Sequence, residues 1–386
     1  MYNFVTLLKL GIFLSNLTLI LLAAGTSSRF ELHVKKQWLR INDKPLWQFV
    51  ADRLEKTKLF DKIIITSNPD DIEFMKNYAD YTFVKGDDTR QKSLKNALTQ
   101  VNSEFVLVSD IARSCVSNLF LNTIISQKEN ADCIVPYLKV TDTVVYKNKT
   151  IQREDVKRIQ TPQLSRVSIL KESLNTHEVF TDESSAIVAH GGTRFFILGE
   201  DAAHKITHIE DLNKISCLEA PSQDTFSGNG FDVHAFAHGG VMWLGGVKIE
   251  SEFGFKAHSD GDVAIHALID ALLGAAGMGD IGMMFPDNDD AYKGIDSKEL
   301  LKIVVDKLKS FGYVIINVDI TIAAQKPRIG AYKFSMRKVL SQILGINSSR
   351  VNIKATTTEK LGFIGREEGV GVLANANLKY YDWTKN

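Results

Sequence analysis

Cysteine and proline are scarce in this chain. Its 386 residues include three cysteines, Cys115, Cys133 and Cys217, and seven prolines. The cysteine count is odd and no two cysteines have the CxxC spacing, so the pattern does not suggest a disulfide framework or a cysteine-rich metal site. Few cysteines without such spacing are typical of proteins in a reducing compartment. We therefore expect no disulfide framework and a cytoplasmic location.

A surplus of charge is also absent. The chain has 46 basic and 46 acidic residues, which gives a formal net charge of zero. A protein whose main partner is nucleic acid needs a basic surplus to neutralise phosphates, so we exclude that class and retain local pockets for small phosphates. Hydrophobic residues make up 44% and charged residues 24%, as in ordinary globular proteins. The length predicts two or three domains.

No long, uninterrupted apolar run is present. The best candidate, residues 4–24, contains Lys9 and several polar residues and has no Ala-x-Ala cleavage site. A membrane helix or a signal peptide would be the alternative interpretation. We instead expect Leu17–Leu22 to be a buried strand and residues 1–16 to be an extension that the first domain does not need. One hypothesis places the true translation start near Leu14 or Leu17. No stable membrane association is expected.

The chain divides into two halves with a segment rich in small and turn-forming residues between them. In residues 17–212, short apolar runs alternate with helical patterns, which predicts an α/β domain with a largely parallel sheet. Residues 213–228 are expected to form a linker. Residues 229–386 form a second domain of mixed strands and helices. Expected strands are Leu17–Leu22, Lys62–Thr66, Phe105–Val108, Cys133–Pro136, Thr193–Leu198, Asn317–Ala323 and Val351–Ala355, with others near Phe231 and Val241; expected helices in the first half include Leu46–Lys56 and Ser93–Val101.

A loop for a nucleotide follows the first expected strand. It reads Leu22-Ala23-Ala24-Gly25-Thr26-Ser27-Ser28-Arg29, and Lys36-Gln37 comes shortly after. Small residues let backbone N–H groups approach phosphate oxygens closely, while Arg29 and Lys36 add positive charge. This spacing resembles that of the sugar-phosphate nucleotidylyltransferases.

Further motifs narrow the resemblance to the 2-C-methyl-D-erythritol 4-phosphate cytidylyltransferases, over most of residues 17–212. They are Gly86 with Arg90 and Ser93, Asp110 with Ala112-Arg113, Asp142-Thr143, Arg153, Thr161-Pro162-Gln163, Thr181-Asp182-Glu183-Ser184 and Lys205-Ile206-Thr207. The resemblance implies a Rossmann-like nucleotidyltransferase domain. In this family a substrate phosphate attacks the α-phosphate of CTP and pyrophosphate leaves.

The resemblance also implies roles for individual residues. Arg29, Lys36 and Lys205 would be the catalytic cations. Thr143, Arg153 and Thr161 would hold methylerythritol phosphate, with Arg153 contributed by a dimer partner. The residues implied to bind CTP are Ala23, Ala24, Gly25, Arg90, Ser93 and Asp110. The pattern departs from the family at Lys35, Ile111 and Ser114, so a degenerate scaffold domain is the competing interpretation.

In the second half, Asp232 and His234 lie two residues apart in an expected strand, so both side chains point to one face. His266 lies in an amphipathic helical pattern and could supply a third ligand. One carboxylate and two imidazoles suit Zn²⁺ and leave a fourth position open, as in catalytic zinc sites. Asp270, one helical turn after His266, could orient an imidazole. The alternative is a set of surface histidines beside a solvated acidic turn.

A longer set of motifs makes residues 229–386 similar to the 2-C-methyl-D-erythritol 2,4-cyclodiphosphate synthases. They are Gly230-Phe231-Asp232-Val233-His234, Gly245-Gly246-Val247, Ala257-His258-Ser259-Asp260-Gly261-Asp262, His266, Asp270-Ala271-Leu272-Leu273-Gly274, Gly279-Asp280-Ile281-Gly282, Phe285-Pro286-Asp287 and Lys354-Ala355-Thr356-Thr357-Thr358-Glu359-Lys360-Leu361-Gly362-Phe363. The resemblance implies an α+β domain. In this family the 2-phosphate of a cytidyl-diphospho-methylerythritol attacks its own β-phosphate and CMP leaves.

The resemblance implies zinc on Asp232, His234 and His266, and Mg²⁺ or Mn²⁺ on Glu359. It gives His258 and Thr357 catalytic roles. The residues implied to contact substrate, or a prenyl diphosphate in a central cavity, are Ser259, Asp280, Asp287, Ala324, Arg328, Thr356, Thr358, Phe363 and Arg366. Family members of this second type are trimers, so dimer contacts in the first domain and trimer contacts in the second predict a hexamer. The whole chain is expected to be a bifunctional enzyme of the non-mevalonate isoprenoid route; the alternative is a monofunctional cyclase with a scaffold domain.

Overall fold

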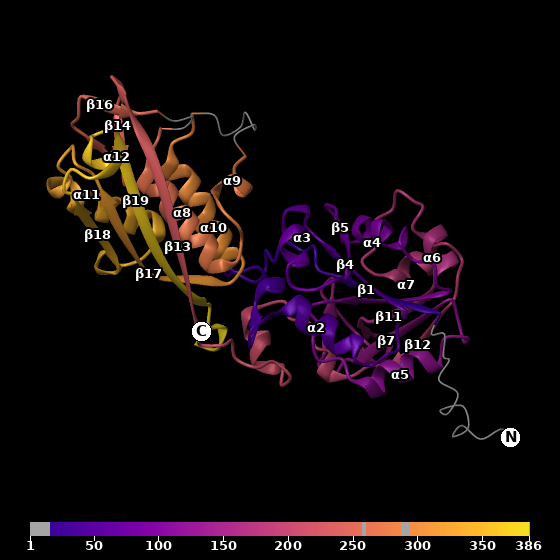
Figure 1. Cartoon of the computed structure of the whole chain (residues 1–386). Helices are drawn as coiled ribbons and strands as arrows, with labels where there is room; N and C mark the ends of the chain where they lie inside the picture. The colour runs from indigo at the N-terminus through magenta and orange to yellow at the C-terminus, as the bar shows by residue number, and fades with distance from the viewer. Residues whose placement is uncertain (1–15, 257–259, 287–293, 386) are drawn as a thin grey trace. The chain divides into compact units, whose positions relative to one another are not determined.

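The computed structural model describes residues 16–256, 260–286 and 294–385. The chain forms two compact units (Figure 1). Unit 1 consists of residues up to 32 and residues 43–219, and unit 2 of residues 33–42 and 220–386. Each unit has its own sheet and its own helices, so each is described by itself.

Unit 1 is built on an eight-stranded sheet with the order β10-β7-β11-β6-β1-β4-β5, to which β12 adds along β7. Strands β6, β1, β4 and β5 run parallel, and β12 runs parallel to β7. Strands β10 and β11 run antiparallel to their neighbours. The strands are β1 (Leu17–Leu22), β4 (Lys62–Ser67), β5 (Thr82–Lys85), β6 (Phe105–Asp110), β7 (Cys133–Lys139), β10 (Lys157–Ile159), β11 (Gln163–Arg166) and β12 (Arg194–Leu198).

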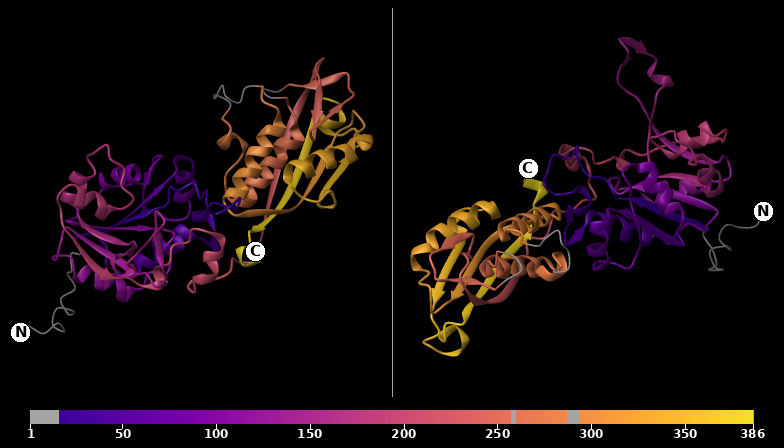
Figure 2. Two further views of the ribbon diagram at one scale, coloured as in Figure 1. Left: turned by 180° about the vertical axis from the view of Figure 1, so that it is seen from behind. Right: turned by 90° about the horizontal axis from the view of Figure 1, so that it is seen from above.

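Helices connect the parallel strands of unit 1, as expected for a Rossmann-like domain (Figures 1 and 2). The helices of this unit are α2 (Leu46–Glu55), α3 (Pro69–Lys76), α4 (Arg90–Leu98), α5 (Asn118–Ser126), α6 (Val167–Ser173) and α7 (Glu183–Ala189), with short helices η2 (Arg153–Asp155), η3 (Asp201–Ala203) and η4 (Ile209–Lys214). The short helix η1 (Lys36–Trp38) lies in the segment of residues 33–42 and belongs to unit 2. A fully buried apolar cluster that includes Ile20, Ile64 and Val108 joins the sheet to Leu94 of α4 and Ile187 of α7. The α/β expectation for this half is confirmed.

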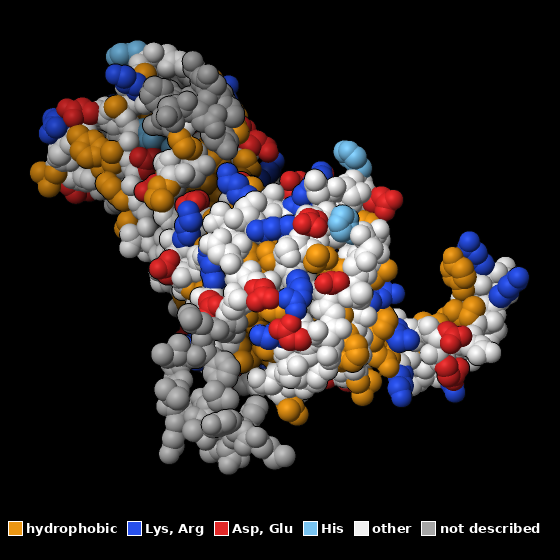
Figure 3. All heavy atoms as spheres, turned by 90° about the vertical axis from the view of Figure 1, so that its right-hand side faces the viewer, with side chains coloured by type: hydrophobic (Ala, Val, Ile, Leu, Met, Phe, Trp, Pro, Cys, Tyr) orange, Lys and Arg blue, Asp and Glu red, His pale blue; other side chains and the backbone are white. Residues whose placement is uncertain are grey.

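A two-stranded hairpin leaves the body of unit 1. It consists of β8 (Val144–Tyr146) and β9 (Lys149–Ile151), and it extends away from the sheet in the right-hand view of Figure 2. Val145 and Tyr146 are each 61% exposed. Hydrophobic and basic side chains lie together on this extension at the right-hand edge of Figure 3. The hairpin therefore presents apolar surface outside the core of its own unit.

Unit 2 is built on a five-stranded sheet with the order β16-β13-β19-β17-β18. Its long strands β13 and β19 are antiparallel, whereas β17 and β18 are parallel. The strands are β13 (Thr225–His238), β16 (Phe253–Phe255), β17 (Tyr313–Ala323), β18 (Val351–Thr356) and β19 (Gly369–Tyr380), and a separate pair is formed by β14 (Met242–Leu244) and β15 (Val247–Ile249). This arrangement is the α+β domain expected from the sequence.

Helices pack on one face of this sheet. They are α8 (Val263–Ala276), α9 (Ile281–Met284), α10 (Ser297–Ser310) and α11 (Lys333–Leu344); the short helix α12 (Gly362–Gly365) lies on the opposite face, where a side chain at Gly371 would meet Ile364 and Val233. Burial alternates along β13, because even-numbered residues from Phe226 to His234 face α8 while odd-numbered residues face outward. The outward face exposes Phe231 (64%), Val233 (44%) and Leu373 (44%). One side of the sheet thus holds the core, and the other is partly apolar and exposed.

A short segment from the N-terminal half belongs to unit 2. Residues 33–42 were expected to lie in the first domain, but they cluster with the second unit. Trp38 is fully buried and stacks on Phe311 with a centroid distance of 4.0 Å. The guanidinium of Arg40 lies 4.6 Å from the ring centroid of Tyr380, and Trp383 Nε1 donates a hydrogen bond to the Arg40 carbonyl. Aromatic stacking and cation–π contacts therefore explain why residues 33–42 pack with unit 2.

Two sequence-based expectations require correction. Cys115 and Cys217 form a disulfide with a Cα–Cα distance of 5.8 Å, although the odd cysteine count argued against one. The spacing of the cysteines in the sequence could not predict this pair, because the two residues are 102 positions apart and meet only in the folded unit. Strand β13 begins at Thr225, inside the expected linker of residues 213–228, because it pairs with β19 from that residue onward. None of the helices in the described part of the chain has the length and apolarity that crossing a bilayer requires.

Candidate functional sites

The first candidate site lies at the carboxyl ends of the parallel strands of unit 1, where open α/β sheets bind ligands. Strand β1 ends at Leu22, which is paired with Asp110 at the end of β6. The next residue, Ala23, donates a backbone hydrogen bond to Thr66 at the end of β4. A side chain at Gly86 would collide with Ala24, so glycine permits the close approach of these two loops. The predicted loop from Ala23 to Arg29 therefore emerges at the edge where Asp110 lies.

Asp110 organises the charges at this edge. Its carboxylate is 8% exposed and accepts hydrogen bonds from Lys205 Nζ at 2.6 Å and from Arg90 Nε at 3.4 Å. Arg90 also donates to buried Glu183 at 2.5 Å. Burial alone would raise the pKa of Asp110, but the positive charges of Arg90 and Lys205 outweigh it and lower this pKa to about 2. Asp110 is thus a carboxylate that holds two of the predicted site cations together.

A cavity of about 330 Å³ opens beside Lys205. Arg113 lines it, donating from Nε to Thr161 Oγ1 at 2.8 Å and from Nη1 to the Ala203 carbonyl at 2.5 Å. Three other basic residues also line the cavity, and no role was predicted for them from the sequence: Arg158, His204 and His208. Their only sequence signal was proximity to Thr161 and Lys205, which is too weak to separate them from surface charges. The cavity is suited to an anionic ligand.

Ser93 lies beside the loop that begins at Ala23, because a side chain at Gly86 would meet both Ala24 and Ser93 Oγ. Ser93 is buried on α4, where its hydroxyl accepts from Asp87 N and donates to the Thr89 carbonyl, each at 2.9 Å. Thr143 precedes β8 and Arg153 follows β9; both are exposed and lie at the same end of the hairpin, where Val144 pairs with Ile151. Arg153 donates to the Thr141 carbonyl at 2.7 Å. Lys36 lies in the segment that clusters with unit 2, and its predicted role stays a prediction.

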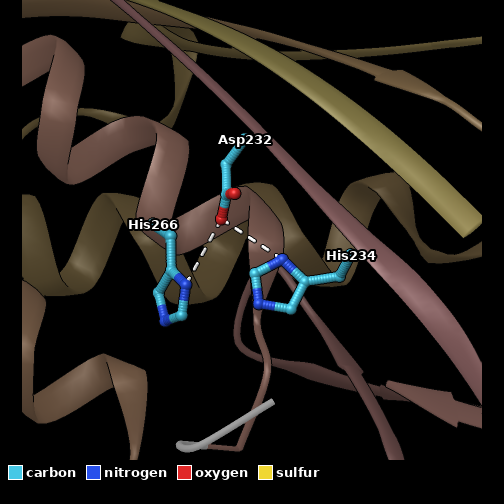
Figure 4. A group of neighbouring side chains, drawn as sticks. All are labelled: Asp232, His234 and His266. Atoms are coloured by element: carbon cyan, nitrogen blue, oxygen red, sulfur yellow. Dashed lines mark ion pairs between the residues drawn. The ribbon is translucent and has the colours of Figure 1, made fainter. Parts of the chain in front are cut away.

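The second candidate site is a metal centre in unit 2. Asp232 and His234 project from β13 and His266 projects from α8, and their ligand atoms lie within 4.8 Å of one another (Figure 4). Asp232 Oδ2 is 3.3 Å from His234 Nδ1 and 3.4 Å from His266 Nδ1. Burial would raise the pKa of Asp232, but its interactions with the two imidazoles dominate and hold this pKa well below the usual range. The predicted cluster of one carboxylate and two imidazoles is therefore formed.

Hydrogen bonds behind the cluster orient His266. Its Nε2 lies 3.0 Å from Ser297 Oγ, so Nδ1 is the nitrogen that faces Asp232. Ser297 in turn donates to Asp260 through its hydroxyl at 2.5 Å and through its backbone N–H at 3.2 Å. Asp270, which we expected to orient an imidazole, accepts instead from the backbone N–H of Ile281 at 2.8 Å. No local pattern pointed to Ser297, because it lies 31 residues beyond His266.

The close packing of β13 and α8 brings the three ligands together. Added side chains at Gly228 or Gly230 would collide with the α8 backbone. Asp262, which is fully buried, caps α8 by accepting from Ala264 N and Ile265 N. The same carboxylate accepts a hydrogen bond from Gly245 N at 2.8 Å, so it stabilises the fold around the N-terminus of α8. These features set the position of His266 relative to the strand.

Most of the remaining predicted residues of this half lie at the ends of β17 and β18 and around α12, where Ala324 donates its backbone N–H to the Thr356 carbonyl. Thr357 Oγ1 donates to Glu359 at 2.8 Å, and Asp280 caps α9 by accepting from Met283 N. Arg366 pairs with Glu368 at 2.8 Å. Ala324 is buried, Arg328, Thr356 and Phe363 are exposed, and Thr358 donates to the Leu361 carbonyl. His258, Ser259 and Asp287 lie outside the described residues.

Comparisons with known proteins match each half separately. Residues 17–218 match the model of the 2-C-methyl-D-erythritol 4-phosphate cytidylyltransferase family. Residues 226–379 match the model of the YgbB family. The two matches share no residue, and together they span nearly the whole chain after residue 16.

Full-length relatives carry both halves in one polypeptide. The chain is 72% identical over 385 residues to the bifunctional enzyme IspD/IspF of Sulfurimonas denitrificans, covering 100% of both chains. It is 54% identical over 371 residues to the enzyme of the same description from Aliarcobacter butzleri, covering 96% of this chain and 99% of the relative. The solved structure of the bifunctional IspDF from Campylobacter jejuni matches with a TM-score of 0.88 and 48% identity, over 95% of this chain and 99% of that one.

Proposed function

This chain belongs to the family of bifunctional IspD/IspF enzymes, and from that premise we propose how its residues carry out the two reactions. The first half is a cytidylyltransferase, which transfers CMP from CTP to 2-C-methyl-D-erythritol 4-phosphate and releases pyrophosphate. The second half is a cyclodiphosphate synthase, which closes the 2,4-cyclodiphosphate and releases CMP. A match in each half supports two activities over a monofunctional cyclase with a scaffold domain.

In the first reaction a phosphate oxygen of methylerythritol phosphate attacks the α-phosphorus of CTP. The bond from that phosphorus to the bridging oxygen breaks, and its electron pair leaves with pyrophosphate. Such a transfer depends on holding two anions in line and neutralising the charge between them. We assign that neutralisation to Lys205, Arg29 and Lys36. The contact of Lys205 with Asp110 supports this role because it holds the ammonium at the carboxyl edge of the sheet.

CTP would be bound by the loop at this edge. Ala23, Ala24 and Gly25 would present backbone N–H groups to its phosphates, with Ser93 and Arg90 behind them. Asp110 would help to place Mg²⁺ or the ribose, since its low pKa keeps it ionised. Methylerythritol phosphate would be held by Thr143, Arg153 and Thr161.

In the second reaction Asp232, His234 and His266 would hold zinc. One carboxylate and two imidazoles fit zinc's preference and leave its fourth position to a substrate phosphate. Bound there, the ion would supply a Lewis acid that steadies a polyanion bent onto itself. His258 and Ser259 would orient the attacking 2-phosphate, Thr356, Thr357 and Thr358 would contact the cytidyl phosphates, and Asp280 and Asp287 the erythritol hydroxyls. Glu359 would carry Mg²⁺ or Mn²⁺, which prefer oxygen ligands.

The remaining assignments in this half concern the ends of the ligand and a second ligand. Ala324 and Arg328 would meet the cytosine. Arg366 and Phe363 would line a central cavity that takes a prenyl diphosphate. The exposed position of Arg328 is compatible with a contact to a neighbouring subunit.

We further propose a cytoplasmic homo-oligomer. The exposed apolar side chains of the β8–β9 hairpin support dimer contacts in unit 1. The outward face of β13 and β19, with Phe231, Val233 and Leu373 exposed, supports trimer contacts in unit 2. A two-fold and a three-fold contact in one chain generate a hexamer of dihedral symmetry.

Pyrophosphate release from CTP and methylerythritol phosphate, with Mg²⁺ present, tests the first assignment. Lys36→Ala should lower this release at least 100-fold, because a cation at the transferring phosphate stabilises the transition state. Lys35→Ala is the matched control, since it removes the neighbouring charge and should change the rate less than two-fold. CMP release by the second reaction should stay normal in both variants. Normal pyrophosphate release by Lys36→Ala would refute the assignment.

A further inference from the structure

Lys205 stands on a piece of chain with no regular structure of its own. Residues 204–208 lie between η3 and η4 and form neither helix nor strand. Such a segment obtains no backbone hydrogen bonds from a ladder, so other groups must anchor it. The ammonium of Lys205 nevertheless lies 2.6 Å from Asp110 and borders the 330 Å³ cavity. The placement of this cation therefore depends on what holds residues 204–208.

Asp211 supplies one set of anchors. Its carboxylate is buried, with 7% exposure, and accepts from Thr207 N at 2.8 Å and His208 N at 2.9 Å. His204 Nε2 lies 2.8 Å from Oδ1 of the same carboxylate, and Lys214 Nζ donates to it at 3.3 Å. Burial raises the pKa of Asp211, but the hydrogen bonds from His208 N, His204 and Thr207 N hold it well below the usual range. The carboxylate is thus hydrogen-bonded to residues on both sides of Lys205.

The loop after β6 supplies the other anchors. Ile206 donates its backbone N–H to the Ala112 carbonyl at 2.9 Å, and Arg113 Nη1 donates to the Ala203 carbonyl at 2.5 Å. Asp110, the acceptor of the Lys205 ammonium, opens this same loop. The segment is therefore held between the Asp110 loop on one side and Asp211 on the other, with Lys205 at its centre.

We propose that Asp211 is a positioning residue for Lys205 in cytidylyl transfer. Its carboxylate fixes both flanks of Lys205, so the ammonium stays at Asp110 and at the mouth of the cavity. Displacing a reacting or charge-stabilising group by about 1 Å can cost about 100-fold in rate. The inference rests on the proposed role of Lys205 in the first reaction.

The test uses the full chain and the variant Asp211→Asn, with Glu210→Gln as its matched control. Glu210 is the preceding carboxylate in the same short helix and is exposed. Asparagine keeps the size and one acceptor oxygen, but it loses the charge and places an N–H₂ group where two donors point. We expect kcat for pyrophosphate release to fall at least 10-fold in Asp211→Asn, with KM for CTP within two-fold, and no change in Glu210→Gln.

A double-mutant cycle separates positioning from general support of the fold. If Asp211 acts through Lys205, Asp211→Asn should have no further effect in a chain that already carries Lys205→Ala. Equal losses in both backgrounds, or no loss in either, would overturn the inference. CMP release by the second reaction, measured on the same samples, reports whether the chain is intact.

Two further variants keep the inference testable if Asp211→Asn fails to fold. His204→Ala removes one donor to Asp211 and should lower kcat about 3-fold to 10-fold, whereas His204→Gln retains an N–H donor and should restore most of it. Equal kinetics for these two variants would count against the inference. If Lys205→Ala itself releases pyrophosphate normally, the proposed function of Lys205 fails. If Lys205→Ala is inactive and the Asp211 and His204 variants are normal, the positioning role alone fails.

Discussion

At the scale of single residues, Asp110 shows how a buried carboxylate is kept ionised. It has little contact with solvent, which by itself disfavours its charged form. The positive charges of Arg90 and Lys205, which both donate hydrogen bonds to Asp110, favour the charged form. Arg90 also donates a hydrogen bond to buried Glu183. The charges of this candidate site therefore stabilise one another.

The pH dependence of stability should reveal this arrangement. The pKa of Asp110 is lowered to about 2 in the folded state, below the ordinary carboxyl value near 4. Its contribution to stability is thus fully present above about pH 4 and is lost as the pH falls through about 2. Urea unfolding of unit 1 between pH 5 and pH 2 should show a stability difference between wild type and Asp110→Asn that shrinks toward low pH. A difference for Asp110→Asn that stays constant over this pH range would contradict the account.

Ser297 illustrates a residue that acts on a metal site from behind. Its hydroxyl fixes the ring of His266, and partners of this kind are worth about 10-fold to 100-fold in metal affinity. Ser297→Ala should therefore weaken zinc binding about 10-fold, as measured by competition with a chromogenic chelator. Ser310→Ala, at the far end of the same helix, should leave zinc affinity unchanged. Equal zinc affinity in Ser297→Ala and wild type would show that the hydroxyl does not orient the ligand.

At the scale of elements, the metal centre depends on how closely β13 and α8 approach. On the inner face of the strand two glycines precede the two candidate ligands, since Gly228, Gly230, Asp232 and His234 all face α8. The glycines allow the helix to lie against the strand, and the two ligands beyond them meet His266. The sequence predicted the strand, the helix and the ligands, because each has a local pattern.

Other parts of the sites could not be predicted because they depend on long-range contacts. Ser297 is 31 positions from His266 and 37 positions from Asp260 in the sequence, but it is hydrogen-bonded to both. Asp211 is a different case, because its four donors lie only three to seven positions away; it was missed because no motif of its own marks it. Residue types and spacing thus predicted the cluster of Asp232, His234 and His266, but not Ser297, which contacts His266.

A methyl group on the inner face of β13 tests the strand–helix contact. Gly230→Ala should push α8 away, with a cost of about 1–3 kcal/mol in the free energy of unfolding and a loss of zinc affinity. Asn229→Ala, on the outward face of the same strand, is the control and should change neither quantity appreciably. Denaturant unfolding and a zinc titration on both variants measure the two effects. A fully stable, zinc-binding Gly230→Ala chain would contradict the packing argument.

At the scale of the whole molecule, unit 2 contains a segment from the first half of the sequence, so the two units are not two consecutive stretches of chain. The segment of residues 33–42 lies within the N-terminal family match, yet it packs with unit 2 through Trp38 and Arg40. From composition, residues 33–42 were expected in the first domain, because no pattern within this segment indicates that Trp38 and Arg40 pack on aromatic rings of unit 2. The second unit is therefore incomplete without a piece of the first half of the chain.

Two fully buried tryptophans, nine positions apart, test this division. Trp38→Ala should loosen unit 2, because its stacking on Phe311 and about 3–5 kcal/mol of packing are lost. Trp47→Ala should loosen unit 1 instead, since Trp47 lies on α2. Hydrogen exchange would detect the difference: faster exchange around Phe311 in the first variant, and in α2 in the second. Faster exchange around Phe311 in both variants, or in neither, would be inconsistent with the division.

The central claim is that one chain carries two activities on two separate sets of residues. The most direct measurement records pyrophosphate release and CMP release side by side, with Mg²⁺ and Zn²⁺ present, for wild type, Lys205→Ala and Asp232→Asn. Lys205→Ala should lose pyrophosphate release at least 100-fold and keep CMP release, because the ammonium serves only the first site. Asp232→Asn should show the opposite pattern, because it removes the charged ligand of the metal centre. Loss of both activities in either variant, or retention of both, would contradict the account.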